Sequence, residues 1–365
     1  MRSRSLVLGI LALGAFGLSA CTETTTEPSG GAEPSPAAPE LAVAGNTWLI
    51  GATMSQYRTG VAAATVTNAA GQSIVYAIGG QNPIWFNPQA TVTAYNAATN
   101  TWTFRQPLPV RLASTNGAGV IKGKIYISGG CTDRICLFPV SSLYMYDPAR
   151  DTWTKKRDIP ADTSSPYGES RKAEGRGVTG VINDKLYVVS GCFMTDIGHG
   201  DDETCDPLFY RYNPATDRWT QLPSPFAWQH PVIASNIGGV IDGKFYVMAS
   251  SPWTGEAYFA SYDPATNNWR PENAPAGGFR GGAAAAVVGG RLYLFGGTRW
   301  NSSHDAIDTL AITIRYDPTT GTWARRADLP VPKTGIAASR LYLNGKARIE
   351  LVGGSGAGNN LQYTP

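Results

Sequence analysis

The chain has 365 residues, of which 42% are hydrophobic, so a sizeable core can form and global disorder is excluded. The formal net charge is only +3, from 30 basic and 27 acidic residues, which excludes a nucleic-acid partner held by a basic excess. A low charged fraction of 16%, with 42 glycines, 25 prolines and 17 tyrosines, favours an all-β chain with many turns.

Residues 1–20 have the features of a signal peptide. Arg2 and Arg4 precede an apolar run from Leu6 to Leu18 that is too short to span a bilayer stably. The run ends in Leu-Ser-Ala-Cys at residues 18–21, which resembles the lipobox of bacterial lipoproteins. The resemblance implies cleavage before Cys21 and a lipid on its sulfur. The alternative is an ordinary signal peptide that ends near a cysteine.

Residues 21–45 are expected to be a lipid-anchored, disordered tether. They are rich in Pro, Thr, Glu and Gly and hold almost no large apolar side chains, so they cannot repay the entropy cost of ordering. The chain is therefore expected to be exported and fixed to the bacterial cell envelope only through its lipid. Thr22, which is not an aspartate, favours the outer membrane if the host is Gram-negative.

From residue 46 onward the chain is a repeat. Five segments carry Tyr-Asn or Tyr-Asp with a tryptophan seven residues after the tyrosine, and an apolar strand ending in small residues precedes each. A sixth such strand, Ile349–Gly354, has no tryptophan after it, whereas Asn46-Thr47-Trp48 lies before the first repeat. The five segments are Tyr95–Trp102, Tyr146–Trp153, Tyr212–Trp219, Tyr262–Trp269 and Tyr316–Trp323.

This pattern resembles the Kelch β-propeller family, and the resemblance covers residues 46–365. It implies an all-β, six-bladed propeller of four-stranded blades, in which the N-terminal strand at Trp48 is the outer strand of the blade completed by 335–364. Ser190-Gly191 and Ala249-Ser250 depart from the double glycine of the family. The repeated Gly, Tyr and Trp have structural roles, so function is expected in what does not repeat. A monomer is expected.

Strand parity sorts the connections onto two faces. With strands a to d counted from the centre outward, the b–c loops and the connections to the next blade open on one face, here called the loop face. The a–b and c–d turns open on the other, here called the turn face. The loops vary in length and carry tryptophans outside the repeat, so ligands are expected there. Trp85, Trp253 and Trp300 are the candidates, and the alternative is that they only pack the loops.

Basic side chains recur near the start of each inner strand. A cationic rim at the channel mouth would bind carboxylates, as in acidic sugars or acidic peptides. The alternative is that each group donates to backbone carbonyls between blades. The candidates are Arg58, Arg111, Arg171, His230, Arg280 and Lys333, with Arg176 as a rival to Arg171.

Two function classes follow from these residues. The first is a binding module for a glycan or protein, without cofactor or metal, because the chain has no G-x-S-x-G, HExxH or Walker-type motif. The second follows from the Kelch resemblance, which includes metal-free sialic-acid mutarotases. Glu169 or Glu174 with Arg171 or Arg176 would supply an acid–base pair, or else a plain ion pair. A copper-dependent, galactose-oxidase-like enzyme is a remote alternative with only His199, His230 and His304 available.

Four cysteines remain after Cys21, two in each of two consecutive b–c loops. Two local disulfides, Cys131–Cys136 and Cys192–Cys205, are the simplest arrangement for an exported chain, and the spacing matches a zinc site poorly. The loop at 196–206 is acidic, and a solvated loop is favoured there over a calcium site.

Overall fold

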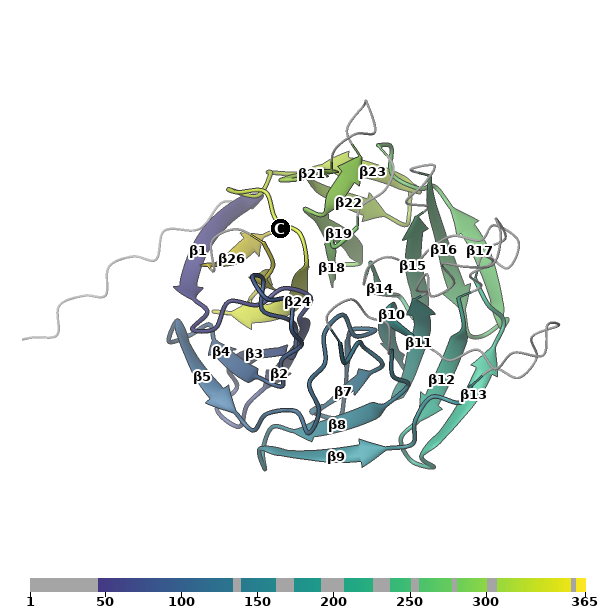
Figure 1. The fold of residues 1–365 in the computed structure, drawn as a ribbon. Helices are drawn as coiled ribbons and strands as arrows, with labels where there is room; N and C mark the ends of the chain where they lie inside the picture. The colour runs from purple at the N-terminus through teal and green to yellow at the C-terminus, as the bar shows by residue number, and fades with distance from the viewer. Residues whose placement is uncertain are drawn as a thin grey trace, which may run out of the picture. The chain divides into compact units, whose positions relative to one another are not determined.

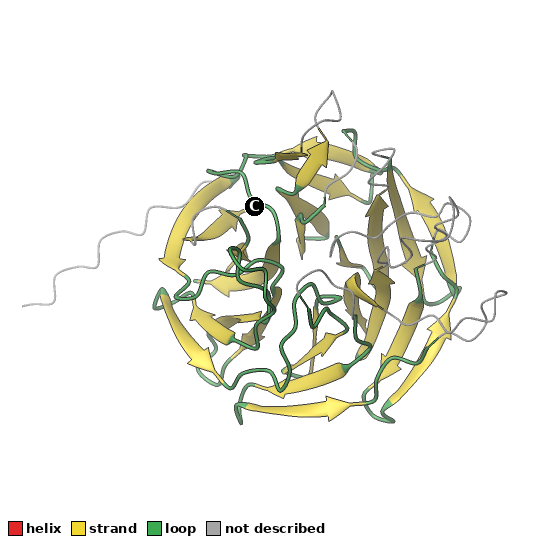
Figure 2. Cartoon of the chain, viewed as in Figure 1, coloured by secondary structure: helices red, strands yellow, loops and turns green. Residues whose placement is uncertain are grey.

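The computed structural model describes residues 45–133, 139–161, 174–191, 207–225, 237–250, 256–277, 281–300, 307–355 and 359–365. Residues Val43–Pro365 form one compact unit. Its described residues form strands, turns and loops without any helix (Figure 2). The described part therefore contains no helix that is long and apolar enough to cross a membrane.

The described strands form six four-stranded antiparallel sheets, the blades, and one small two-stranded sheet (Figure 1). From the inner to the outer strand, blades one to three are β2 (Ala62–Thr67), β3 (Ser73–Ile78), β4 (Val92–Asn96), β5 (Thr101–Arg105); β6 (Ala118–Ile121), β7 (Lys124–Ser128), β8 (Leu143–Asp147), β9 (Thr152–Lys156); β10 (Glu174–Ile182), β11 (Lys185–Gly191), β12 (Phe209–Asn213) and β13 (Arg218–Leu222). Blades four to six are β14 (Gly238–Ile241), β15 (Lys244–Ser250), β16 (Ala257–Asp263), β17 (Asn268–Glu272); β18 (Ala284–Val288), β19 (Arg291–Phe295), β22 (Thr313–Asp317), β23 (Thr322–Arg325); β24 (Ile336–Leu343), β25 (Lys346–Gly353), β26 (Asn359–Thr364) and β1 (Thr47–Thr53).

The six blades form a closed ring. Each inner strand contacts the inner strands of both neighbouring blades, in the cyclic order β2, β6, β10, β14, β18, β24 and back to β2. Six hydrophobic clusters lie between successive blades, so the core is divided among the interfaces. The six-bladed all-β architecture predicted from the repeat is confirmed.

The ring closes through the N-terminal strand, as predicted. β1 pairs antiparallel with β26, with Trp48 opposite Tyr363 and Ile50 opposite Leu361 (Figure 1). The Trp48 ring lies 4.8 Å from the Tyr363 ring and 5.6 Å from the Phe295 ring of blade five. Chain segments from opposite ends of the sequence therefore complete one blade, and β1 covers the edge that β26 would otherwise expose.

The repeated tryptophans join each blade to the one before it. On each of the six outer strands, the indole Nε1 donates a hydrogen bond to a backbone carbonyl of the preceding blade, at 2.7 to 3.1 Å. The pairs are Trp48 and Ala327, Trp102 and Ala52, Trp153 and Gln106, Trp219 and Arg157, Trp269 and Pro223, and Trp323 and Asn273.

The double glycine is required by backbone contact between loops. Gly79 and Gly80 have φ angles of 62° and 88°, and a Cβ at Gly79 would lie 2.5 Å from the Leu112 carbonyl oxygen.

Blade five adds a feature that the repeat did not indicate. A hairpin of β20 (Thr298–Trp300) and β21 (Ile307–Thr309) extends its b–c loop.

Candidate functional site

The loop face presents one strongly exposed apolar tip within the 82–88 loop of blade one. Ile84, Trp85 and Phe86 are 72%, 69% and 43% exposed. The Asn82 side-chain Oδ1 accepts hydrogen bonds from the backbone N–H groups of Ile84 and Trp85, at 2.8 and 3.0 Å. The tip is therefore held by its own loop while its side chains remain in water. Trp85 lies on the loop face as predicted, and its ligand-binding role stays a prediction.

The backbone of this tip is also strained. Phe86 has a φ of 53°, a conformation that bulky L-residues rarely adopt, and its N–H donates to the Asn82 carbonyl oxygen at 2.8 Å. The base of the loop is fixed by paired hydrogen bonds between Gln81 and Thr59, at 2.8 and 3.0 Å. The hydrogen bonds hold this turn rigid while three apolar side chains are exposed to water, so little conformational entropy would be lost when they bind a partner.

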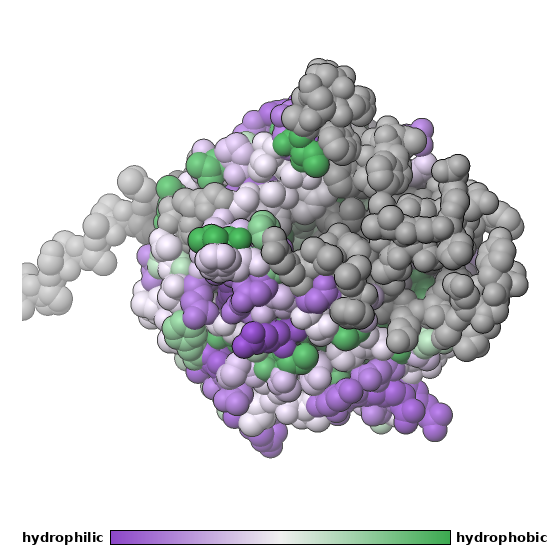
Figure 3. All heavy atoms as spheres, viewed as in Figure 1, coloured by the Kyte–Doolittle hydropathy of each residue, from purple (hydrophilic) through white to green (hydrophobic). Residues whose placement is uncertain are grey.

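Hydrophobic surface is otherwise scattered over the described part of the face in view. Figure 3 shows hydrophobic side chains there as small separate groups among hydrophilic ones. Isolated apolar side chains are ordinary on protein surfaces, whereas three consecutive ones at a loop tip are not. The 82–88 loop is therefore the described feature of this face that most needs a functional explanation.

Arg58 corrects the predicted cationic rim. Its side chain is 1% exposed, and its guanidinium donates to the backbone carbonyls of Gly79 and Thr91 and to the Thr93 hydroxyl. Burial lowers the pKa of Arg58 to about 10. Arg58 therefore links strands β3 and β4 of blade one. This is the alternative role stated above, donation to backbone carbonyls, and it leaves the side chain inaccessible to a ligand.

Lys333 also lies inside the protein and not on an open rim. It is 1% exposed, its Nζ lies 3.3 Å from the Ser355 carbonyl oxygen, and burial lowers its pKa. Arg111 differs because it is exposed, in the connection that precedes β6. The sequence pattern grouped these cations by sign of charge, but burial separates Arg58 and Lys333 from Arg111.

The described central cavity carries no charge in its lining. It measures about 80 Å³, and every inner strand contributes to its wall. Small or apolar residues from the inner strands line it, among them Ala62, Ala118, Thr179, Gly238, Ala284 and Ala337. This part of the channel thus offers no anion clamp.

The side chains of the remaining predicted site residues lie outside the described part of the chain. Glu174 and Arg176 lie at the start of β10, where the backbone alone is described, and Trp300 likewise lies in β20. The other candidates lie outside the described residues altogether: Glu169, Arg171, His199, His230, Trp253, Arg280, His304, Cys136, Cys192, Cys205 and the acidic loop 196–206. Among the described residues, no group of three His, Cys, Asp or Glu side chains could hold a metal ion.

A larger cavity lies on the turn face, where the sequence predicted only short regular turns. It measures about 620 Å³ and lies between blades four and five, along β17 and the Pro318–Gly321 turn. Sequence reasoning missed it because the residues that form it belong to two different repeats.

Comparisons with known proteins agree with the fold. The Kelch motif model matches residues 114–159, 176–225 and 280–330. Kelch-like protein terF of Aspergillus terreus is 29% identical over 273 residues, which are 72% of this chain and 56% of that protein. Kelch repeat and BTB domain-containing protein 12 of Homo sapiens is 28% identical over 47% of this chain and 27% of that protein. The chain thus spans about half, or less, of the length of these relatives.

The solved structure of YjhT is similar in fold, with a TM-score of 0.60 at 16% sequence identity. The match covers 86% of this chain and 95% of that one. Together with the strand order, these findings establish a six-bladed β-propeller that contains Kelch motifs.

Proposed function

We propose that this chain is an exported binding module that recognises a protein through its loop face. The observation that carries the proposal is the braced apolar tip of the 82–88 loop, with Trp85 69% exposed. Interfaces draw most of their binding energy from a few aromatic anchors that are already rigid before binding. Exposed Arg111 adds a charge on the same face that an acidic group of the partner would pair with.

The rest of the envelope assignment is part of the same proposal. Cys21 carries a lipid after cleavage of residues 1–20, and residues 21–45 tether the propeller to the membrane as a monomer. The predicted disulfides, Cys131–Cys136 and Cys192–Cys205, fit an oxidising compartment. Cys131 is 2% exposed and carries a disulfide bond, which supports the first pairing.

A photo-crosslinking experiment tests the proposed face. p-Benzoylphenylalanine would replace Trp85 in one variant and Phe104 in a matched control, in cells that naturally make the full chain. Phe104 is 57% exposed but lies on the outer strand β5, away from the loops. We expect one discrete protein adduct from position 85 and none from position 104, with a lower yield when Arg111→Ala is added. Equal adducts from both positions, or none from position 85, would contradict the proposal.

The second candidate is a metal-free carbohydrate-active enzyme of the sialic-acid mutarotase type. Its support is the position of Glu174 at the start of the inner strand β10, two residues before Arg176. The anomers of N-acetylneuraminic acid can be followed by NMR after dissolution. An acceleration by the full chain that Glu174→Gln abolishes would favour the enzyme, and an unchanged rate would remove it.

A further inference from the structure

The turn face of blade five departs from a feature that the other five blades share. In those five blades, the residue just before the outer strand has a left-handed φ and an Asn or Asp side chain. Its Oδ1 accepts a hydrogen bond from the tyrosine hydroxyl of the same blade. In blade five this residue is Gly321, with a φ of 65° and no side chain. The five complete pairs are Asn46 with Tyr363, Asn100 with Tyr95, Asp151 with Tyr146, Asp217 with Tyr212, and Asn267 with Tyr262.

The tyrosine of blade five therefore turns to a different partner. Tyr316 donates its hydroxyl hydrogen bond to Oε2 of Glu272 in blade four, at 2.8 Å. Ser261 donates to the other oxygen, Oε1, at 2.7 Å. Two hydroxyls thus fix one half-buried carboxylate between the blades, and the missing side chain at Gly321 leaves the space in front of it open.

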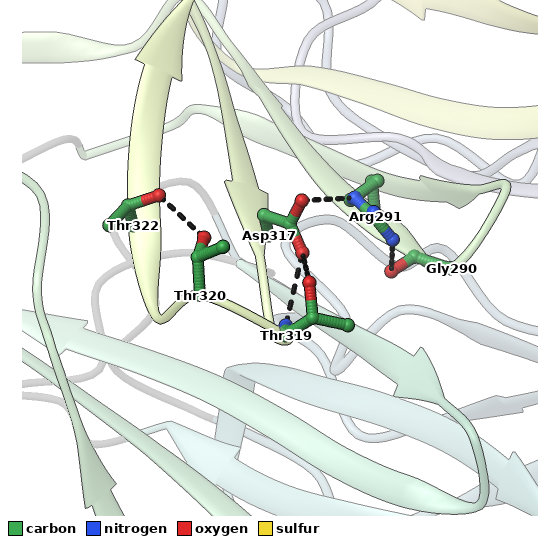
Figure 4. A network of polar contacts seen from close by, with 6 residues as sticks. All are labelled: Gly290, Arg291, Asp317, Thr319, Thr320 and Thr322. Carbon is green, nitrogen blue, oxygen red and sulfur yellow. Dashed lines mark hydrogen bonds and ion pairs between the residues drawn. The ribbon is translucent and has the colours of Figure 1, made fainter.

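This space is the cavity of about 620 Å³ between blades four and five, here called the polar groove. Its wall from blade five is the Pro318–Gly321 turn, which Figure 4 shows from close by. Asp317 accepts hydrogen bonds from the N–H and hydroxyl of Thr319 and pairs with Arg291 at 2.8 Å (Figure 4). The hydrogen bond from the Thr319 hydroxyl holds the pKa of Asp317 below its usual range, so the turn keeps its anchor at neutral pH.

The lining of the polar groove indicates the class of ligand. Hydroxyls and amides predominate, including those of Ser261, Thr319, Thr320 and Asn273, and they offer both donors and acceptors. Exposed Arg270 adds a positive charge to the lining, and the fixed carboxylate of Glu272 adds a negative one. Sugar hydroxyls donate and accept at once, so this mixture suits a polyhydroxylated ligand.

Charge and size narrow the class further. The lining contains Asp242, Asp263 and Glu272 against Lys244 and Arg270, and Asp263 is already paired with Lys244 at 3.1 Å. The remaining excess of negative charge disfavours carboxylated sugars. A volume of about 620 Å³ lies within the range of roughly 300–1,000 Å³ typical of small-ligand sites. We propose that the polar groove binds a neutral oligosaccharide segment of two or three sugars, on the face opposite the proposed protein-binding loops.

The experiment measures binding of neutral trisaccharides by calorimetry, with the full chain. The probes are cellotriose, maltotriose, mannotriose and triacetylchitotriose, each at millimolar concentration. The main variant, Gly321→Asn, restores the residue type of the other blades and fills the groove. It should fold, because Asn267 has the same left-handed conformation. A Cβ at Gly321 would meet only Nδ2 of Asn273, at 3.4 Å, which donates to the Gly321 carbonyl oxygen.

Two further variants separate the groove from other effects. Gly71→Asn is the matched control, because Gly71 has a φ of 75° in a hairpin of blade one with open space around it. Arg270→Ala removes an exposed charged donor from the groove. We expect at least one probe to bind, and the affinity to fall roughly tenfold or more in Gly321→Asn and in Arg270→Ala, but not in Gly71→Asn or Trp85→Ala. Failure of all four probes to bind, or binding that survives Gly321→Asn, would overturn the proposal.

Discussion

Glu350 gives the propeller a pH-dependent stability that one substitution should remove. Glu350 lies three residues before Gly353, the first small residue at the end of its strand. At the same offset in the other five blades stands a tyrosine that packs on a tyrosine of the next blade. Glu350 instead lies fully buried at the interface of blades six and one, where the ring closes. The five tyrosines are Tyr76, Tyr126, Tyr187, Tyr246 and Tyr293.

The groups around the Glu350 carboxyl do not stabilise its charged form enough to offset its burial. Gln362 donates to Oε2 at 3.0 Å and Arg348 attracts the carboxylate, both of which lower its pKa, but the loss of water outweighs them. Oε1 has no hydrogen-bond partner among the described residues. Tyr95 of blade one faces Glu350, and mainly its own burial raises its pKa, so it stays neutral. Burial therefore raises the pKa of Glu350 from 4.5 to about 8.

The sign of the pH dependence follows from this shift. Below about pH 4.5 the carboxyl is protonated in both states, so it contributes no difference. Between 4.5 and about 8 the unfolded chain ionises while the folded chain keeps its proton, so the free energy of unfolding falls as pH rises. The full difference corresponds to about 5 kcal/mol, at about 1.4 kcal/mol per pH unit.

Urea unfolding of wild type and Glu350→Gln at pH 5 and pH 8 measures this term. We expect Glu350→Gln to gain several kcal/mol relative to wild type between the two pH values, because glutamine cannot ionise in the unfolded chain. Glu256→Gln, at an exposed carboxylate, should show no such gain. A stability difference between Glu350→Gln and wild type that is the same at both pH values would show that Glu350 does not bind a proton more tightly in the folded chain.

Three further predictions concern the ring closure at Trp48, the buried Arg58 and the lipid attachment at Cys21. Trp48→Ala should cost about 3–5 kcal/mol of unfolding free energy, because it removes the ring that joins β1 to blades five and six, whereas Trp85→Ala should cost less than about 0.5 kcal/mol by the same denaturant assay. Arg58→Met should cost about 2–3 kcal/mol or more in thermal unfolding, because the carbonyls of Gly79 and Thr91 lose their donor, while exposed Arg111→Ala stays near wild type. Cys21→Ser should abolish metabolic labelling by a lipid analogue and release the chain from the membrane fraction, and retention of the label would contradict the lipidation proposal.

The repeat was enough to predict the fold because its signals are local. The seven-residue spacing from tyrosine to tryptophan places both on adjacent outer strands of one blade, as Tyr146 and Trp153 show by facing each other in register. The lone Trp48 and the sixth strand without a tryptophan together predicted the closure of the ring. No contact with a distant segment had to be known for either inference.

The predicted basic rim failed at Arg58 and Lys333 for a physical reason. A cation near the start of an inner strand can point outward into water or inward to backbone carbonyls, and strand periodicity does not distinguish these in an irregular connection. Arg58 donates four hydrogen bonds to oxygen atoms of blade one, which compensates its burial. Arg111 has the same charge and a similar position in the repeat but is exposed.

Two departures were visible in the sequence, but their consequences were not. Gly321 differs from the Asn or Asp of the other repeats, and Glu350 differs from a repeated tyrosine. What each departure does depends on a residue from another blade: Glu272 takes the Tyr316 hydrogen bond, and Tyr95 faces Glu350. Such contacts between repeats follow from the closed ring and not from the spacing within one repeat.

Hydrogen–deuterium exchange of the full chain tests most directly whether its loop face binds a protein. The chain would be compared alone and in an envelope extract of the cells that naturally make it. We expect slower exchange in the extract for residues 82–88 and for the adjacent connection that contains Arg111, with no change in the outer strands β5 and β9. Slower exchange confined to the outer strands, or no change on the loop face at all, would show that the loop face is not the binding surface.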